Sequence, residues 1–597
     1  MKYVACDVET RDLTAQYDPN CPLWMAGFQW ADDACIVHDD PVKIGHQVAL
    51  LLDEGYDFVF ANASFDVSVL RLRGINIPPG RYHDIALMHY LLEPSEGQNH
   101  SLDTMAQLHL GKEKVHFHNF SEPSEAMADY LRQDVLLTWQ LISPVTSRIM
   151  RDEELWWYYL DIALPYTEVL IDMVQAGVRI DRDALRVAHA EWEGVLNDIV
   201  SKFHAEAGYR RGRTITYDKL LPFRDGRMTS FSPLTGFYSH CELSWLNPAS
   251  VSDITAVLKS YPDFEPVKVS PKTGLPVLDK HTLPVYAEEY EIASIVQEHR
   301  TAHKFFTAFL HPILERVEVD TLVHCSFHDK NTRTTRKSCS KPNLQQIPSD
   351  KKRGASLRNM FVPRDENHVL VVGDLDRIEI CVFAFYLEHM FGYKGLSDAV
   401  RAGIDVHQRN CEAWHCDRKS AKIGIFLTIY GGGAGKLSQA TGLSIAQARE
   451  VLKRMYNDLP IERYREACFR EVKENKGYLR GLFGDRYFIP ECLSNNESVR
   501  HSGMRKAGNY RIQGTAGSVF DILQVESIDT VRSLGGRQLL AVHDEAVYEF
   551  PRETAEAGAE YLTSTWTRND LLDFDGTMVP VRAEFHIGQS WHEAKGE

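Results

Sequence analysis

The sequence predicts an α/β domain at its N-terminal end, followed by a larger α+β body. In residues 1–150, short apolar runs such as KYVACDV and FVFAN alternate with stretches of helical pattern, as in a sheet covered by helices. From residue 368 onward, strand-like runs such as HVLVVGDLD and RQLLAVHDEAVYEF alternate with long helical stretches. The length of 597 residues is enough for about four domains of roughly 150 residues each.

The composition is that of a globular protein without a membrane or targeting segment. Hydrophobic residues make up 44% and charged residues 25% of the chain, and no run of about 18 apolar residues occurs. The start, MKYVACDVET, has neither a secretory signal pattern nor an arginine-rich transit pattern. The 11 cysteines include no CxxC pair, which favours free thiols and a cytoplasmic protein. Cys411, His415 and Cys416 alone are too few ligands to predict a zinc site.

Charge is unevenly distributed along the chain. The net charge of −17 by itself disfavours a nucleic-acid partner, and residues 1–150 hold 21 acidic against 10 basic side chains. Residues 331–360 are the opposite, with eight lysines and arginines and one aspartate. Such a stretch is typical of a phosphate-binding surface or of a solvated loop, and the pattern alone leaves both open.

The part of the chain between the two predicted bodies is mainly helical. Aromatic residues 156–159 open a stretch that we expect to pack at a domain junction, and residues 182–204 and 283–316 have helical patterns. Residues 208–246 differ, because Gly, Pro, Ser and Thr alternate there with basic side chains, which predicts an exposed loop or a small subdomain. The basic residues are Arg210, Arg211, Arg213, Lys219, Arg224 and Arg227.

Acidic residues in the first 150 positions are spaced to bind divalent metal ions. Asp7 and Glu9 alternate on a predicted strand and so share one face, and Asp66 follows the next strand, FVFAN. Tyr130 and Asp134 lie four apart on one face of a predicted helix. If the four carboxylates converge, they can hold two ions that activate a water and stabilise the leaving oxygen of a phosphodiester. The tyrosine would orient that water.

The order of these residues resembles the three motifs DxE, NxxxD and YxxxD of the DEDD-type 3′–5′ proofreading exonucleases. The resemblance covers residues 1–150 and implies a ribonuclease H-like α/β exonuclease domain. It implies that Asp7, Glu9, Asp66 and Asp134 are metal ligands, that Tyr130 orients the attacking water, and that Asn62 contacts DNA.

A second set of acidic residues lies in the C-terminal half. Asp374 ends the apolar strand HVLVVGD, and Asp544 and Glu545 lie at the turn of a hairpin predicted for LLAVHDEAVYEF. Two strand-borne aspartates would hold two divalent ions that bind a nucleoside triphosphate and activate a 3′-hydroxyl.

Residues 418–430 supply the positive charge that such chemistry needs. Arg418, Lys422, Phe426 and Tyr430 are spaced by four along one face of a predicted helix. The cations would meet the phosphates, and the aromatic rings would meet the sugar and base of one nucleotide. For this helix taken alone, an amphipathic helix with its aromatic rings in the core is the alternative.

The segments DLDRIEI, RxxxKxxxFxxxYG and VHDE together resemble motifs A, B and C of DNA polymerase family A, the bacterial polymerase I kind. Residues 332–336, 342–345, 403–407 and 505–516 agree with further motifs of that family. The resemblance covers roughly residues 155–597 and implies an α+β polymerase right hand. The domains implied are a thumb with connecting helices at 151–320, carrying a basic insertion at about 208–246, the first part of the palm at 321–400, the fingers at 401–495, and the second part of the palm at 496–597.

The resemblance also implies a role for each matching residue. Asp374 and Asp544 would bind the catalytic metals with Glu545 close by, and Lys422 would protonate the pyrophosphate leaving group. The nucleotide-binding residues would be Arg418, Lys422 and His407 at the triphosphate, Phe426 and Tyr430 at the sugar and nascent pair, and Glu379 as the block to a ribose 2′-hydroxyl. The primer–template would be held by Arg336, Gln345, Arg505, Asn509, Gln513 and His543. Phenylalanine at 426 implies discrimination against dideoxynucleotides.

Motif A departs from the family pattern DYSQIELR. Leu375, Asp376, Arg377 and Cys381 replace its Tyr, Ser, Gln and Arg, and Thr335 replaces the glycine of a TGR motif. In the pattern QGTAAD, Gly517 and Ser518 replace the last two residues. No metal ligand or triphosphate contact is lost, so the departures concern DNA grip and fidelity.

We therefore expect a DNA-directed DNA polymerase with 3′–5′ exonuclease proofreading and two Mg²⁺ or Mn²⁺ ions at each site. Its partners would be primer–template DNA and deoxynucleoside triphosphates, with a processivity factor, helicase or primase left open and no membrane. The exonuclease motif begins at residue 7, so no 5′-nuclease domain is expected. This arrangement is similar to phage replicative enzymes, which would place the protein in the host cytoplasm.

Two alternatives to this function stay open. One is a DNA-binding 3′–5′ exonuclease with a decayed polymerase site, and the other is a scaffolding protein with a decayed polymerase fold. The basic insertion would add DNA grip or dock a processivity partner, with a purely structural elaboration as the alternative.

Overall fold

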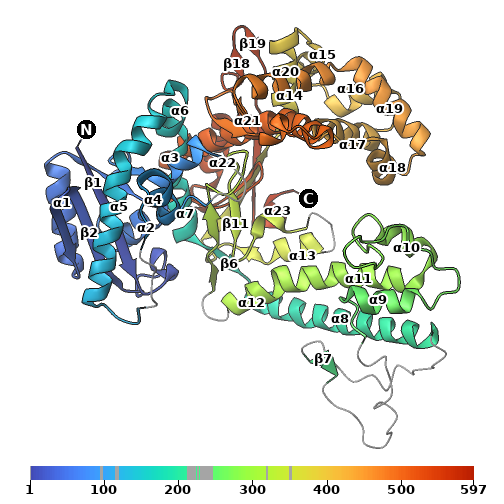
Figure 1. Cartoon of the computed structure of the whole chain (residues 1–597), viewed down its shortest axis with the longest axis horizontal. Coiled ribbons are helices and arrows are strands. Elements are labelled where there is room, and N and C mark those ends of the chain that lie inside the picture. Colours follow the sequence, from blue (N-terminus) through green and yellow to red (C-terminus); the bar gives the residue numbers. More distant parts are fainter. Residues whose placement is uncertain are drawn as a thin grey trace, which may run out of the picture. The chain divides into compact units, whose positions relative to one another are not determined.

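The chain divides into two compact units (Figure 1). Unit 1 comprises Met1–Val178, His324–Ser340 and Val362–Glu597, and unit 2 comprises Arg179–Val323 and Lys341–Phe361. The computed structural model describes residues 2–94, 99–114, 120–210, 246–317, 321–348 and 353–596, and the short strands β7 (Phe223–Arg224) and β8 (Arg227–Met228). Most of the predicted basic insertion at 208–246 lies outside these residues. Within them, no helix has the length and apolar character needed to cross a membrane.

Unit 1 begins with a five-stranded mixed sheet in the order β3-β2-β1-β4-β5, in agreement with the predicted α/β domain. Strand β1 is central, antiparallel to β2 and parallel to β4. Helix α5 packs across β1 and β2. The strands are β1 (Lys2–Thr10), β2 (Leu23–Ala31), β3 (Ala34–His38), β4 (Tyr56–Phe60) and β5 (Tyr82–Asp84). The helices are α1 (Pro41–Asp53), α2 (Ala63–Leu72), α3 (Ile85–Leu92), α4 (Leu102–Leu110) and α5 (Glu125–Ile149).

The C-terminal part of unit 1 contains a four-stranded antiparallel sheet in the order β16-β17-β13-β20. The strands are β13 (His368–Leu375), β16 (Arg537–Val542), β17 (Glu545–Pro551) and β20 (Ala583–Gly588). The helices of this region are α14 (Ile378–Phe391), α21 (Glu497–Ser533), α22 (Ala555–Trp566) and α23 (Trp591–Ala594). The smaller elements are α6 (Glu153–Tyr158), α7 (Tyr166–Ala176), β10 (Ser326–His328), β11 (Ser338–Ser340), β18 (Asp573–Phe574) and β19 (Thr577–Met578).

Six helices and a hairpin lie between α14 and α21 in the sequence. The helices are α15 (Gly395–Arg401), α16 (Val406–Trp414), α17 (Arg418–Ile429), α18 (Ala434–Thr441), α19 (Ile445–Asp458) and α20 (Ile461–Glu474). The hairpin pairs β14 (Tyr478–Arg480) with β15 (Arg486–Phe488). Helix α17 begins where the Asp417 carboxylate accepts a hydrogen bond from the Ser420 backbone N–H, which is the usual helix N-cap. The predicted helix at 418–430 is therefore present.

Two apolar cores hold unit 1 together. The first lies under the five-stranded sheet, where Val4, Phe28, Phe58 and Leu131 are completely buried. The second joins the four-stranded sheet to α14 and α21 and includes Val371 and Tyr386. Tyr166 of α7 is buried in the second core and donates a hydrogen bond to Gln524. The spacing of apolar residues, every second residue in strands and every third or fourth in helices, therefore predicts which faces are buried.

Unit 2 is mainly helical and has a core of its own. Helix α8 (Arg182–Arg210) extends the helix predicted at 182–204, and α8 packs against α11. Phe203, Ile254, Ile292 and Val296 are buried between them and their neighbours. The other helices are α9 (Val251–Leu258), α10 (Leu283–Glu289), α11 (Glu291–Phe305), α12 (His311–Val317) and α13 (Arg353–Asn359). A small sheet, β12-β6-β9, is formed by β6 (Val178–Ile180), β9 (Leu322–Val323) and β12 (Phe361–Val362).

Candidate active sites

The first candidate site lies in the N-terminal part of unit 1, where α5 crosses β1. Asp7 and Glu9 lie on β1, and Tyr130 and Asp134 lie on α5. The close approach of helix and sheet depends on Gly27 of β2, which pairs with Asp7: a Cβ there would lie 2.9 Å from the Cγ of Leu131. The strand and the helix expected to carry these residues are both present.

Three carboxylates of this site converge. One oxygen each of Asp7, Glu9 and Asp134 lies within 4.8 Å of the others, and no second such cluster of potential ligands occurs among the described residues. Cys411, His415 and Cys416 thus form no such group. The Oδ1 of Asp134 is buried without a hydrogen-bond partner, as expected of an oxygen that faces a cation. Asp66 of α2 is outside the cluster and accepts a hydrogen bond from the Val8 backbone N–H at 3.2 Å. This donor set of oxygens fits a hard divalent ion.

Burial and mutual repulsion raise the pKa of every carboxyl group in this site. Burial, with the charge of Asp66, raises the pKa of Asp7 well above its usual range. Burial and the Asp134 charge raise the pKa of Glu9 to about 7. Burial also raises the pKa values of Asp66 and Asp134. A bound divalent cation would favour the charged forms and so reverse these shifts.

Lys114 contributes positive charge to this site. Its Nζ lies 2.6 Å from Asp134 Oδ2, and it lies 4.8 Å from the centre of the Tyr130 ring. No sequence pattern predicts a role for this residue, because it lies in the segment between α4 and α5, where no periodicity applies. Asn62, by contrast, was predicted and is the N-cap residue of α2, with Lys330 Nζ 3.4 Å from its Oδ1.

The second candidate site lies on the four-stranded sheet. Strands β16 and β17 are joined by a two-residue turn, His543–Asp544, in which His543 has a positive φ of 60°. Asp374 at the end of β13 pairs with Glu545, and the Leu375 backbone N–H donates to the Asp544 carbonyl at 3.1 Å. The hairpin therefore brings Asp544 beside Asp374, as expected.

Both aspartates have perturbed acidity. Burial and the Asp374 charge raise the pKa of Asp544 to about 6, and burial and the Glu545 charge raise the pKa of Asp374. Glu545 is not free to bind a metal in the same way. Its Oε1 accepts from the Trp591 indole N–H at 2.7 Å, and its Oε2 lies 2.7 Å from Lys595 Nζ.

An open pocket of about 960 Å³ lies in front of the two aspartates. Six predicted residues line it: Asp374, Asp544, His407, Arg418, Lys422 and Phe426. Arg418 is paired with Asp405, with 2.7 Å between Nη2 and Oδ2. The described residues offer Lys422 no hydrogen-bond or ion-pair partner, so its ammonium is available to a ligand. A pocket with carboxylates on one side and cations on the other suits a metal-bound polyphosphate.

The other predicted residues of this site lie around the pocket. Glu379 accepts a hydrogen bond from Arg336 at 2.6 Å and another from the Tyr430 hydroxyl at 2.5 Å. Tyr430 also interacts with Gln513 of α21. Phe426 and Tyr430 have stacked rings 6.4 Å apart.

Four more predicted residues lie on α21, in the hairpin turn and in unit 2. Arg505 and Asn509 lie on α21; Arg505 packs against Gly431, and the Asn509 Oδ1 is buried without a partner. His543 lies in the hairpin turn, and burial lowers its pKa. Gln345 belongs to unit 2, whereas the others belong to unit 1.

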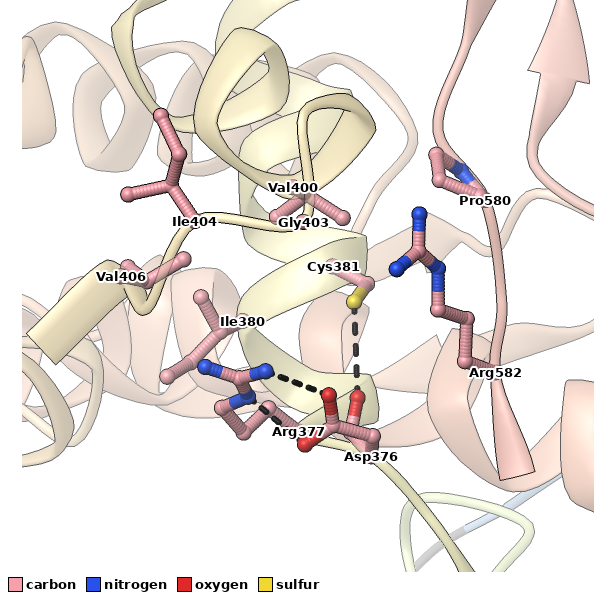
Figure 2. A pocket seen from close by; sticks show the side chains of 10 residues that line it. All are labelled: Asp376, Arg377, Ile380, Cys381, Val400, Gly403, Ile404, Val406, Pro580 and Arg582. Atoms are coloured by element: carbon pink, nitrogen blue, oxygen red, sulfur yellow. Dashed lines mark hydrogen bonds and ion pairs between the residues drawn. The ribbon is translucent and has the colours of Figure 1, made fainter. Parts of the chain in front are cut away.

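Three of the four substituted residues of motif A, namely Asp376, Arg377 and Cys381, line a small pocket of about 40 Å³ beside the larger one (Figure 2). Figure 2 shows the Arg377 guanidinium directed at the Asp376 carboxylate, with 2.7 Å between Nε and Oδ1. The Cys381 thiol lies 3.7 Å from the Asp376 carbonyl oxygen. Arg582 lines both pockets.

Asp405 is a residue of this site that the sequence reasoning did not assign. Its Oδ1 accepts from the His407 backbone N–H at 2.9 Å and lies 3.5 Å from the Arg377 Nη1. Its Oδ2 is the partner of Arg418. An aspartate just before a predicted helix is a recognisable N-cap signal, but its contact with two arginines depends on the fold.

Comparisons with known proteins match two regions of the chain to families. The family model of DNA polymerase family A matches residues 235–593, and that of 3′-5′ exonuclease matches residues 1–149. The thermostable DNA polymerase I of Thermus filiformis is 28% identical over 542 residues, covering 89% of this chain and 57% of the relative. DNA polymerase I of Bacillus subtilis is 26% identical over 570 residues, covering 91% and 58%. The chain thus spans a little over half the length of these relatives.

A solved structure shares the fold. The POL domain of Pol1 from M. smegmatis, in complex with DNA primer-template and dNTP, matches with a TM-score of 0.80, covering 99% of this chain and 96% of that one. At 22% sequence identity this likeness concerns the fold: a mixed α/β region followed by an α+β region, as predicted.

Proposed function

Because the chain belongs to DNA polymerase family A and carries a 3′–5′ exonuclease region, we propose that it synthesises DNA on a template and removes nucleotides from the 3′ end. The pocket of about 960 Å³, with Asp374 and Asp544 opposite Arg418 and Lys422, is the observation that best supports this. Carboxylates for divalent ions and cations for a triphosphate are the two requirements of nucleotidyl transfer.

In the polymerase site, Asp374 and Asp544 would hold two divalent ions, Mg²⁺ or Mn²⁺, which when bound would activate the primer 3′-hydroxyl and neutralise charge on the phosphates. Arg418 leaves Asp405 for a phosphate oxygen, and Lys422 donates a proton to the departing pyrophosphate. His407 adds a third contact to the triphosphate. Glu545 acts as a positioning residue, because its bonds to Trp591 and Lys595 fix the end of β17.

Selection of the nucleotide follows from the residues around the pocket. Phe426 and Tyr430 face the sugar and the nascent base pair, and Phe426 disfavours dideoxynucleotides. Glu379, fixed by Arg336 and Tyr430, occupies the space that a ribose 2′-hydroxyl needs, so deoxynucleotides are preferred. The primer–template is held by Arg336, Gln345, Arg505, Asn509, Gln513 and His543.

In the exonuclease site, Asp7, Glu9, Asp66 and Asp134 would hold the divalent ions, which when bound would activate water and stabilise the leaving 3′-oxygen. Tyr130 orients the water, and Asn62 contacts the DNA strand. Mg²⁺ is the expected ion at both sites. The chain works in the cytoplasm, which is the host cytoplasm if it replicates phage or similar DNA, and a helicase, primase or processivity factor would be its partner.

A labelled-primer assay tests the proposal. Purified protein is given Mg²⁺ and a 5′-labelled primer–template, with and without the four deoxynucleotides. We expect extension with nucleotides and shortening from the 3′ end without them, extension being lost in Asp544→Ala and shortening in Asp7→Ala. Shortening under both conditions would contradict synthesis and favour a nuclease with a decayed polymerase site.

A further inference from the structure

Lys114 is an unassigned cation that touches two residues of the exonuclease site at once. Its Nζ is 2.6 Å from Asp134 Oδ2, and its side chain is 19% exposed while that of Asp134 is 4% exposed. The Asp134 carboxylate at this distance is the ion-pair partner of the Lys114 ammonium. A charge this deeply placed requires a specific partner.

The backbone places Lys114 over the site independently of its side chain. Helix α4 ends at Gly111, which has a left-handed φ of 64° and turns the chain away from the helix. Three residues past the cap, the Lys114 backbone N–H donates to the Asp103 carboxylate of α4 at 3.1 Å. The backbone of Lys114 is therefore held in place, and its side chain extends from there to α5.

The two oxygens of Asp134 have different environments. Oδ2 faces Lys114, whereas the buried Oδ1 has no hydrogen-bond partner and belongs to the side chain that clusters with Asp7 and Glu9. One oxygen is thus fixed by the lysine, and the other remains for a cation. Residues that bind the far side of a metal ligand orient it and tune its basicity.

Lys114 also fixes the direction of the Tyr130 hydroxyl. The Lys114 Nζ lies 4.8 Å from the centre of the Tyr130 ring, and because an ammonium only donates, the phenol oxygen can only accept from it. The hydroxyl proton is then directed away from Lys114, and it interacts with the Asp134 carboxylate. The side chain predicted to orient the water is itself oriented by this lysine.

We propose that Lys114 is a positioning residue of the exonuclease site, which holds Asp134 for metal binding and sets the donor direction of Tyr130. This inference rests on the proposed exonuclease function. In the alternative role, the Lys114 ammonium would occupy the position of a metal ion and compete with it for Asp134.

Mn²⁺ binding and strand degradation test the proposal in the full chain. An Asp544→Asn background removes metal binding at the polymerase site, and electron paramagnetic resonance then measures the Mn²⁺ affinity of the exonuclease site. Lys114→Met is expected to weaken Mn²⁺ binding and to slow single-turnover digestion of a single strand, each by about 10- to 100-fold. Lys114→Arg should restore part of both, since a guanidinium can donate to Asp134 and Tyr130 together.

The matched control is Lys112→Met, which removes the same charge two residues earlier. The Lys112 ammonium lies 2.7 Å from Gln140 Oε1 at an exposed position, so Mn²⁺ affinity and digestion should equal those of the parent. Melting temperatures of all variants establish that they are folded. In a Tyr130→Phe background, the Lys114→Met effect on digestion should shrink, because the two residues act together.

The Mn²⁺ affinity and the digestion rate together distinguish the possible roles of Lys114. Unchanged Mn²⁺ affinity in a folded Lys114→Met variant would overturn the proposal, and tighter Mn²⁺ binding would show that the ammonium competes with the metal. If the parent itself neither binds Mn²⁺ at this site nor digests DNA, the proposed exonuclease function fails instead.

Discussion

Asp485 is a buried acid whose ionisation costs stability. It lies at the turn before β15, where Tyr487 donates to its Oδ2 while its Oδ1 is buried without a partner. Burial raises its pKa to about 6, even though the Tyr487 hydroxyl acts in the opposite direction. The folded chain therefore binds this proton more tightly than the unfolded chain does.

The sign of the pH dependence follows from that difference. Between pH 4 and 6, the folded state holds the proton that the unfolded state loses, so this residue's contribution to stability falls as pH rises and is constant above about pH 6. Asp485→Asn should remove this loss of stability between pH 4 and 6. It should therefore raise the melting temperature more at pH 8 than at pH 4.5. A pKa of about 6 in the folded chain against about 4 in the unfolded chain corresponds to at most roughly 3 kcal/mol of folding free energy. Equal shifts at both pH values in calorimetry would contradict this account.

At the scale of elements, the distance between α5 and β2 controls the exonuclease site. A Cβ on Gly27 would lie 2.9 Å from Leu131 Cγ and 3.1 Å from Val135 Cγ1. Since both contacts belong to α5, a larger side chain displaces the helix that carries Tyr130 and Asp134.

Gly27→Val is therefore expected to reduce exonuclease activity by at least about 100-fold, because a shift of about 1 Å in catalytic groups has an effect of that size. Polymerase activity in the same preparation should persist. Gly45→Ala on α1 is the control, since its Cβ would meet Ile75 at an ordinary 3.6 Å. A Gly27→Val enzyme with full exonuclease activity would show that α5 adapts.

Helices α16 and α17 are tied to motif A through Asp405. This carboxylate faces Arg377 and Arg418 together, so Arg377 continues to neutralise it when Arg418 moves to a phosphate. The Arg377 side chain is 33% exposed and that of Asp405 is 37% exposed. An ion pair at such exposure contributes about 0.2–1 kcal/mol.

Arg377→Gln should accordingly raise the KM for deoxynucleotides by roughly two- to fivefold, with exonuclease activity unchanged. Steady-state primer extension measures this. Arg449→Gln, an exposed change on α19, serves as the control and should leave the KM as it is. An unchanged KM in Arg377→Gln would mean that Arg418 leaves Asp405 without help.

At the scale of the whole molecule, a half-buried lysine joins the exonuclease region to the rest of unit 1. Lys330 Nζ lies 3.1 Å from an oxygen of Asp84 and 3.1 Å from one of Asp329. Asp84 caps α3 and accepts from the Ala63 backbone N–H at the start of α2, which carries Asp66. Removing the lysine would leave two buried carboxylates without their cation.

Lys330→Met is expected to destabilise the exonuclease region by about 3–5 kcal/mol, the range seen when one member of a buried ion pair is removed. In scanning calorimetry, a separate transition at lower temperature should appear. Lys43→Met on the exposed face of α1 should leave the profile unchanged. A single unshifted transition for Lys330→Met would show that other contacts join the two regions.

The sequence predicts those parts of the two candidate sites that depend on the geometry of a single strand, helix or hairpin. Alternation places Asp7 and Glu9 together, four-residue spacing places Tyr130 with Asp134, and the hairpin places Asp544 beside the strand of Asp374. Lys114 could not be predicted, because it lies outside any periodic element. The domain limits inferred from the family resemblance stay predictions, and the joining of three chain segments into unit 1 depends on contacts between distant residues.

The order of the two sites along the chain has a consequence during translation. Every carboxylate of the first candidate site is made by residue 134, before unit 2 begins, whereas the four-stranded sheet needs β13 near the middle and β17 and β20 near the end. A ribosome that stalls or a protease that cuts within unit 2 would thus release a chain carrying the degrading residues but not Asp544. For a cell that makes this protein, interrupted synthesis therefore leaves a fragment with the proposed nuclease residues and no means of replacing the nucleotides it removes.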